Sequence, residues 1–135
     1  MTVRHYRELE VWKLGMRLAH LAYDCTELFP SIERYVLLPQ IRRAALSVPA
    51  NIAEGQGRAH TGEFLNFLSI SRGSLQELET YLIFANERQY LTGAQFEGPM
   101  EVADHVSRKL TRLRQAITAQ PRRAVHRGSR SLRGR

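Results

Sequence analysis

A chain of 135 residues, 43% hydrophobic and 24% charged, has the size and composition of one soluble globular domain that can bury a core without disulfides. Its single cysteine, Cys25, excludes an intrachain disulfide framework, and the opening sequence MTVRHYRELE lacks the apolar region of a signal peptide. No uncharged apolar run approaches the roughly 18 residues of a membrane span, so we expect a cytoplasmic protein with no membrane partner.

The formal net charge of +7 is concentrated at the C-terminal end of the chain. Residues 1–120 hold 14 basic and 13 acidic side chains, whereas residues 121–135 hold six arginines and no acid. The sequence therefore predicts a folded domain over residues 1–120. We expect the basic tail, residues 121–135, to be disordered because it has almost nothing to bury.

The first two predicted helices have clear ends. The first runs from about residue 6 to residue 29, where apolar side chains recur at three- and four-residue steps, and Pro30 stops it. The second runs from near residue 38 to Gly55 or Gly57. Pro49 lies inside it, and we expect a bend there that shapes the bundle rather than a catalytic site.

The third and fourth predicted helices are longer. The third runs from about residue 61 to residue 88, and the fourth begins at Thr92 with a capping-box pattern and ends before Pro121. The links between the four helices are short, and nothing in the chain has the pattern of a strand. Short links place successive helices antiparallel, so the sequence predicts an all-α, up-down-up-down four-helix bundle.

The third helix is apolar on more than one side, which is unusual for a helix in a small isolated bundle. Its second stripe contains Ile70, Tyr81 and Phe84, and the second helix has a weaker second stripe that includes Leu46. Single apolar residues on a surface are ordinary. A stripe shared by neighbouring helices favours contact between subunits, so we expect an oligomer with these four residues at its interface.

A row of polar residues follows one flank of the second helix: Arg43, Ser47, Asn51, Glu54 and Arg58. One explanation is structural, in which Asn51 and Glu54 bond to polar side chains of the third helix and set the register of the two helices. The available partners there are Ser71, Arg72 and Ser74. The other explanation is functional, in which the arginines face an anionic partner. The sequence leaves both open.

No pattern of catalytic or metal-binding residues is present. Dimetal sites in four-helix bundles use Glu-x-x-His pairs, and none occurs in this chain. Gly57 and Gly62 have the spacing of a partial phosphate loop, but Glu63 and Phe64 stand where such a loop needs Lys and Ser or Thr. We therefore expect no enzyme activity, no metal and no cofactor.

Two segments in order carry a family resemblance: QIRRAALSVPANIAEGQGR at residues 40–58 and FLNFLSISRGSLQELETYL at residues 64–82. They closely resemble bacterial four-helix bundle proteins encoded in intervening sequences of 23S rRNA genes, the ribosomal S23-like family. Accessory variability determinants of diversity-generating retroelements are similar proteins. The resemblance is strong over residues 7–92 and absent from the tail. It implies a homopentamer, and its retroelement members bind nucleic acid and a reverse transcriptase through basic surface.

The resemblance also directs attention to particular positions of this chain. The motif positions that match the family include Asn51, Glu54, Ser74 and Glu77, and we expect these four to form a polar cluster with a structural role. The candidate nucleic-acid-binding residues are Arg42, Arg43, Arg58 and Arg72 in the bundle and Arg122, Arg123, Arg127 and Arg130 in the tail. We expect a non-enzymatic scaffold whose partners are copies of itself and RNA or DNA. The alternative is a structural or protein-interaction module with no nucleic-acid role.

Overall fold

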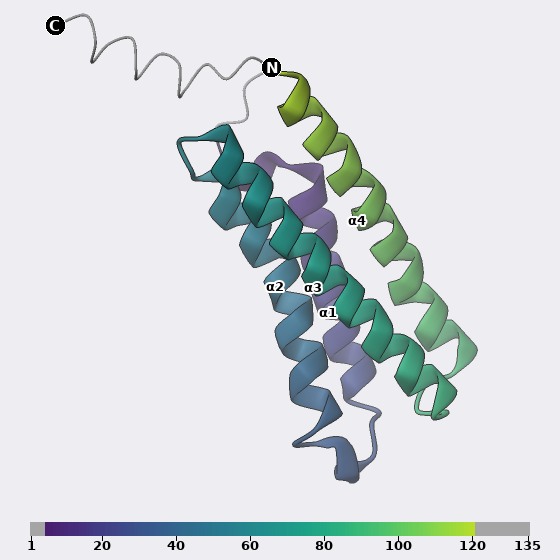
Figure 1. Cartoon of the computed structure of the whole chain (residues 1–135). Coiled ribbons are helices and arrows are strands. Elements are labelled where there is room, and N and C mark those ends of the chain that lie inside the picture. The colour runs from purple at the N-terminus through teal and green to yellow at the C-terminus, as the bar shows by residue number, and fades with distance from the viewer. Residues whose placement is uncertain (1–4, 121–135) are drawn as a thin grey trace, which may run out of the picture.

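The computed structural model describes residues 5–120 and confirms the all-α four-helix bundle, with no strand in that part of the chain (Figure 1). Two short 3-10 turns, η1 and η2, accompany the four α-helices. The elements are η1 (Tyr6–Glu8), α1 (Glu10–Thr26), η2 (Ser31–Glu33), α2 (Leu37–Gln56), α3 (Thr61–Glu87) and α4 (Gly93–Ala119). The tail, with its four candidate arginines, lies outside the described residues.

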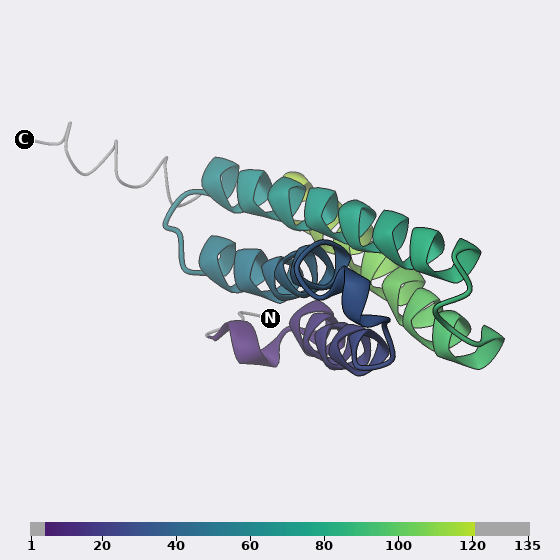
Figure 2. The same ribbon diagram turned by 90° about the horizontal axis from the view of Figure 1, so that it is seen from below.

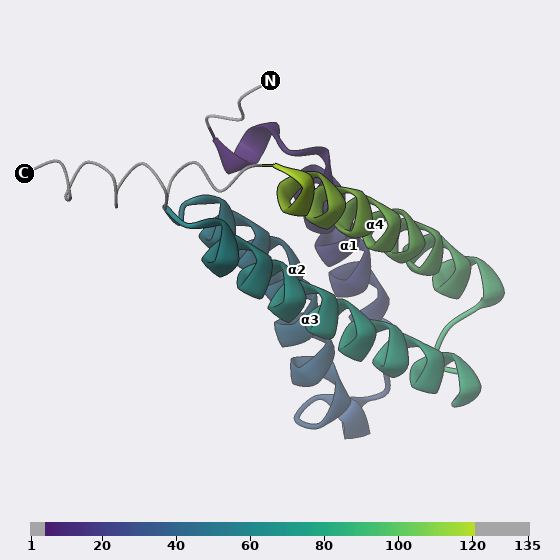
Figure 3. The same ribbon diagram turned by 45° about the horizontal axis from the view of Figure 1, so that its top comes forward.

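The helices run up and down in chain order, and each packs against its neighbours around one core (Figure 1). Figure 2 shows α2 and α3 side by side, and this pair makes the most extensive helix–helix contact. In Figure 3 the α3–α4 hairpin lies over α1 and α2, and α4 closes the bundle against α1. Fully buried leucine, isoleucine, valine and alanine side chains from all four helices fill the centre.

The first helix begins later than its apolar periodicity predicts, at Glu10 rather than near Tyr6. The side chain of His5 accepts a hydrogen bond from the amide of Arg7 and caps the short η1 turn. Leu9 then takes an extended conformation (φ −75°, ψ 126°), which interrupts the helical hydrogen-bond ladder. The local cap therefore overrides the continuous pattern.

Pro49 lies inside a continuous α2 and is buried against α1. A Cβ atom added at Gly15 of α1 would lie 3.4 Å from the Cβ of Pro49, so the absence of a side chain at Gly15 leaves room for the proline ring. The proline removes one helical amide donor. Its ring in return packs into the α1–α2 contact.

The two links at the far end of the bundle contact each other. The hydroxyl of Tyr90, in the α3–α4 link, donates a 2.8 Å hydrogen bond to a carboxylate oxygen of Glu33 in η2, and the rings of Tyr90 and Phe29 have centroids 5.5 Å apart. The capping box predicted at Thr92 is confirmed, with Gln95 as its second member. No helix within residues 5–120 combines the length and apolar character needed to cross a bilayer.

Candidate nucleic-acid interface

The contact between α2 and α3 contains a polar seam made by three serines. The hydroxyls of Ser47 and Ser74 lie 2.6 Å apart, and the buried hydroxyl of Ser71 donates a 2.8 Å hydrogen bond to the carbonyl oxygen of Val48. Val48 immediately precedes Pro49. The seam thus joins the two helices beside the residue that interrupts the amide ladder of α2, and small side chains allow the close approach.

The predicted bonds from Asn51 and Glu54 to α3 are not made, because both side chains bond within α2. The amide of Asn51 donates to the carbonyl oxygen of Ser47 at 2.8 Å and to its hydroxyl at 2.9 Å, so it reaches α3 only through Ser47. Glu54 pairs with Arg58 at 2.6 Å, and its side chain is 52% exposed. An exposed pair four residues apart satisfies itself on one helix. Glu77 is exposed on α3, outside the seam.

Gly55 is a point of close contact between α2 and α3. A Cβ atom at this position would lie 2.7 Å from the Cβ of Phe67 and 3.0 Å from the ring of Phe64, which is too close for either side chain. The guanidinium of Arg58 lies 4.8 Å from the centroid of the Phe67 ring. Arg58 is therefore engaged twice, by the ring and by Glu54, which reduces its availability to an outside anion.

Arg42 and Arg43 are adjacent in sequence but have different surroundings. Arg42 is half-buried, donates a 3.0 Å hydrogen bond to the hydroxyl of Thr26 and lies 4.5 Å from the ring centroid of Tyr23, so it joins α2 to α1. Arg43 is exposed and contacts Gln40 on its own helix. The four candidate arginines of the bundle therefore do not form one patch.

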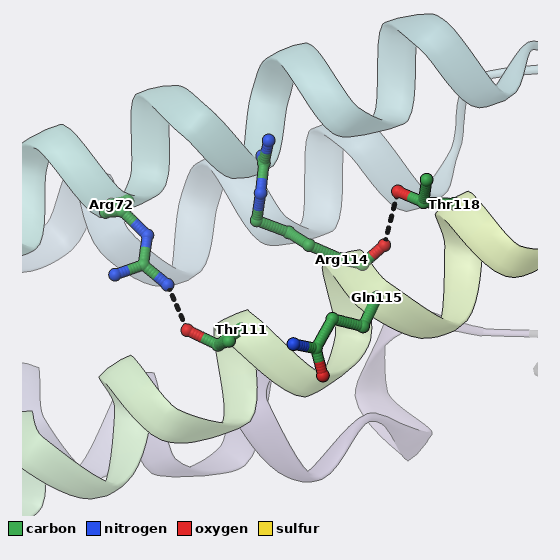
Figure 4. Close-up of a pocket in the computed structure, with 5 residues that line it drawn as sticks. All are labelled: Arg72, Thr111, Arg114, Gln115 and Thr118. Atoms are coloured by element: carbon green, nitrogen blue, oxygen red, sulfur yellow. Dashed lines mark hydrogen bonds between the residues drawn. The ribbon is translucent and has the colours of Figure 1, made fainter.

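Arg72 crosses from α3 to α4 (Figure 4). Its guanidinium donates a 2.6 Å hydrogen bond to the hydroxyl of Thr111 and two longer ones, of 3.4 Å, to the hydroxyl and carbonyl of Ser107. These acceptors are all neutral. The side chain is half-buried, so the fold fixes its position without neutralising its charge by direct pairing.

Arg114 makes the reciprocal crossing, from α4 to α3, and sequence reasoning missed it. One terminal nitrogen donates to the carbonyl oxygen of Leu65 and to the hydroxyl of Ser69, both at 2.9 Å. In the sequence Arg114 is one of several basic residues on the polar side of an amphipathic helix, and nothing there separates it from its neighbours. Only the pairing of α3 with α4 sets it near Arg72.

The two arginines share an open groove of about 480 Å³ between α3 and α4. Neither forms an ion pair with an acidic side chain within residues 5–120. The charge of Arg72 acts on the carboxyl of Glu79. Burial first, and then the charge of Asp104, raise the pKa of that carboxyl, and Arg72 offsets part of the rise. The groove is lined by Arg72, Thr111, Arg114, Gln115 and Thr118.

Charge is segregated along the α3–α4 hairpin. Its loop half, residues 77–105, holds six acidic side chains and one basic side chain. Its open half, residues 61–76 together with 106–120, holds five basic side chains and one acidic side chain, and the Arg72–Arg114 groove lies there. An anionic partner is therefore attracted to the open half and repelled by the loop half.

The four residues expected at an oligomer interface are on α2 and α3 and differ in exposure. Leu46, Ile70 and Phe84 are 47%, 44% and 47% exposed, which is high for large apolar side chains. Tyr81 is half-buried and packs partly against the core. The second apolar stripe is thus present on the surface of one chain, with Tyr81 at its inner edge.

A second exposed apolar region, which sequence reasoning did not identify, lies at the α1–α2 link. Ile32 and Tyr35 are 76% and 84% exposed, and Leu28 and Val36 accompany them. In the sequence these residues look like ordinary link residues between two helices, and only the folded chain reveals that nothing in residues 5–120 covers them. No group of metal-binding side chains occurs in the described part of the chain.

Comparison with known proteins identifies the family. The family model described as 23S rRNA-intervening sequence protein matches residues 7–112, which is most of the chain. The chain belongs to this family. No curated protein matches it. The resemblance seen in the two motif segments over α2 and α3 is therefore confirmed at the level of the family.

A solved structure shows the same fold. It is the crystal structure of a protein of unknown function from the S23 ribosomal protein family of Bacteroides thetaiotaomicron, with a TM-score of 0.70 and 22% sequence identity. The alignment covers 77% of this chain and 97% of the other. At 22% identity, this similarity supports the helical fold of the present family member and nothing beyond the fold.

Proposed function

We propose that this protein is a non-enzymatic oligomeric scaffold that binds RNA or DNA through the open half of the α3–α4 hairpin and the basic tail. The observation that carries the proposal is the segregation of charge along the hairpin, with five basic side chains and one acidic side chain in the open half. A surface that gathers positive charge at one end attracts a polyanion and orients it. The single cysteine agrees with a reducing compartment, so we place the protein in the cytoplasm.

The contacts of the arginines divide them into two groups within this proposal. Arg42 and Arg58 are held by neighbours of the fold, by Thr26 and Tyr23 in one case and by Glu54 and Phe67 in the other. They contribute mainly to stability. Binding then depends on the open half of the hairpin and on the tail, and it tolerates different nucleic-acid sequences because phosphate contacts carry no sequence information.

The oligomer in this proposal is a homopentamer assembled through the second apolar stripe of α2 and α3. Leu46, Ile70 and Phe84 are each more than two-fifths exposed, and large apolar side chains at a surface favour contact between copies. Five copies multiply the tail and the basic half of the hairpin. Multivalent attachment raises the overall affinity for a long polyanion without any new contact.

A protein-interaction module is the second candidate function. It is favoured by the exposed apolar residues of the α1–α2 link, because Ile32 and Tyr35 are far more exposed than apolar residues of that size usually are. This region lies at the end of the bundle away from the open half of the hairpin (Figure 1). A protein partner held there leaves the basic surface unoccupied, so the two functions are separable by mutation.

Nucleic-acid binding is tested by fluorescence anisotropy with labelled RNA and DNA oligonucleotides of unrelated sequence over a range of salt concentrations. We expect similar affinities for different sequences. The slope of log K against log salt changes by about −0.9 for each duplex phosphate neutralised, or about −0.7 for each single-strand phosphate. Replacing the six tail arginines by glutamine flattens this slope. Absence of binding at low salt by the full chain overturns the nucleic-acid role and leaves the protein-interaction module.

Assembly is tested by light scattering coupled to size exclusion. The wild-type mass is expected to be about five times the 15.5 kDa of one chain. Ile70→Glu and Phe84→Glu place charges in the apolar stripe and should lower the mass, whereas Thr80→Glu, on an exposed position of the same helix, should not. Ile32→Glu serves as a second comparison on the α1–α2 link. A wild-type monomer at tens of micromolar contradicts the scaffold.

A further inference from the structure

We propose that the groove between Arg72 and Arg114 is a seat for one phosphate group of a nucleic-acid backbone. This inference rests on the proposed function and assigns its anchor point. The groove is a place in the described chain where two arginines from different helices line the same open space with no acidic side chain in the lining (Figure 4). Two hydroxyls and one amide, from Thr111, Thr118 and Gln115, complete its lining.

The hydrogen-bond donors of the two guanidinium groups are only partly used. Each arginine carries five N–H donors. All the hydrogen bonds of Arg114 to the described chain leave from one terminal nitrogen, and they go to Leu65 and Ser69. Its other terminal nitrogen and its Nε atom have no acceptor within residues 5–120. Arg72 has one good bond, to Thr111, and two long ones. Several N–H donors of the two arginines that line the groove therefore remain unused within residues 5–120.

Carbonyl and hydroxyl acceptors on the facing helix hold both arginines in place. These side chains therefore lose conformational entropy when the chain folds, before any ligand binds. Fixing a free arginine side chain on ligand binding costs conformational entropy. An arginine that is pre-positioned, as Arg72 is by Thr111 and Arg114 is by Leu65, loses less when an anion arrives. Pre-positioning favours a binding role over that of a solvated surface charge.

The electrostatics of the groove favour an anion. Two positive side chains line the same space without an ion-pair partner in the described chain. A phosphate group offers several oxygen acceptors to the guanidinium forks at once, which matches arginine geometry better than a point charge does, whereas the hydroxyls of Thr111 and Thr118 already donate to the carbonyls of Ser107 and Arg114. Lys109 and Arg112 add positive charge in the open half of the hairpin, whereas Arg108 pairs with Asp104 at 3.3 Å.

The decisive variant is Gln115→Glu, which places a carboxylate on the groove itself. Gln115 is exposed and lines the groove, so the substitution supplies an internal anion at little cost in packing. We expect the melting temperature to stay constant or rise, because the new carboxylate faces two arginines. We expect binding to the groove to be lost. Gln89→Glu makes the same chemical change at the acidic loop end of the hairpin and serves as the matched control.

Two probes are used with the full-length protein. The first is a labelled single-stranded RNA of mixed sequence, followed by anisotropy. The second is pyrophosphate, followed through the Nε–H resonances of the arginines in a ¹⁵N-labelled sample. Gln115→Glu should weaken RNA binding about tenfold or more, the factor that corresponds to about 1.4 kcal/mol, and should abolish the pyrophosphate shifts of Arg72 and Arg114. Gln89→Glu should leave both signals close to wild type.

Arg114→Lys provides a second, independent variant that keeps the charge and removes the planar fork. A phosphate seat predicts weaker RNA binding in a variant that remains folded by circular dichroism, whereas a general positive field predicts no change. Unchanged RNA affinity and unchanged pyrophosphate shifts in Gln115→Glu overturn the seat and leave the proposed function intact. If pyrophosphate shifts both arginines but no RNA binds, the groove stands as a phosphate site for a small anion and the nucleic-acid role is the part that fails.

Discussion

The thiol of Cys25 in α1 donates a hydrogen bond of 3.4 Å to the carbonyl oxygen of Gln95 in α4. Four residues after Gln95 stands Pro99, which lies inside α4 and has no amide hydrogen to offer that carbonyl. The thiol therefore supplies a donor that the proline removed. Burial first, and then the neighbouring charge of Asp24, raise the pKa of the Cys25 thiol, which keeps the donating hydrogen in place at neutral pH.

Cys25→Ala should lower the free energy of unfolding by about 1–3 kcal/mol, because the carbonyl of Gln95 loses a donor and the core loses a buried sulfur. Cys25→Ser, which keeps a hydroxyl donor in nearly the same place, should lose less. Urea unfolding followed by circular dichroism compares the two variants. Equal losses in both would mean that packing of the sulfur, rather than its hydrogen bond, stabilises the contact with α4.

Ser71→Ala removes the buried hydroxyl that donates to the carbonyl oxygen of Val48. We expect the free energy of unfolding to fall by about 1 kcal/mol, the net value of one intramolecular hydrogen bond. Thr80→Ala is the control on the same helix, since its exposed hydroxyl bonds only to the carbonyl of Gln76 one turn away. Thermal unfolding measures both. A loss no larger than that of the control would show that the seam does not stabilise the bundle.

Gly55→Ala and Gly73→Ala should have opposite effects, although both replace a helical glycine by alanine. A Cβ at Gly55 meets Phe67 at 2.7 Å, so overpacking should destabilise the protein by about 1–3 kcal/mol. A Cβ at Gly73 would meet no atom within 4 Å beyond its chain neighbours and the backbone of its own helix, and the better helix propensity of alanine should stabilise by about 0.5–1 kcal/mol. Chemical denaturation of both variants tests the pair. A stabilised Gly55→Ala protein is incompatible with the close α2–α3 contact.

Glu54→Ala should change the free energy of unfolding by no more than about 0.5 kcal/mol, because the pair with Arg58 is exposed on one helix and screened by water. The small difference should shrink further in high salt. Thermal melts at low and high salt provide the measurement, with Ser71→Ala as the buried benchmark. A loss of about 2 kcal/mol would indicate that Glu54 bonds to α3 after all.

Glu79→Gln should stabilise the protein at pH 7. Burial first, and then Asp104, raise the pKa of Glu79 above its ordinary value of 4.5, so the folded chain holds this proton more tightly than the unfolded chain. The group favours folding below its ordinary pKa, and that advantage is lost as pH rises through the raised folded value. The gain from Gln should therefore be present at neutral pH and shrink below pH 4.5.

Urea unfolding at pH 7 and at pH 4 measures the effect of Glu79→Gln. Glu77→Gln, on an exposed position two residues earlier, is the control and should change little at either pH. If Glu79→Gln proves less stable than wild type at pH 7, the attraction of Arg72 outweighs burial, and the carboxylate is an ion-pair partner of the groove. That result would also weaken the case for an open phosphate seat.

Local pattern was sufficient for the helices and their order. The three- and four-residue spacing of apolar side chains predicted four helices, and the capping box at Thr92 placed the start of α4 within one residue. Short links then required antiparallel neighbours. Where prediction failed, at the start of α1, the cause was also local, because the side chain of His5 caps a short turn that periodicity does not register.

The partner of each polar side chain was decided only by the tertiary structure. The sequence determined that Asn51, Glu54 and Arg58 share a flank of α2, but not that Glu54 turns to Arg58 while Ser47 makes the bond to α3. Likewise, the sequence does not distinguish Arg114 from the other basic residues on the solvent-exposed face of its helix. Its position beside Arg72 depends on the register between α3 and α4, and that register is set by the packing of the buried side chains of one helix against those of the other. Periodicity along one helix states which residues share a face, whereas packing between helices determines what that face meets.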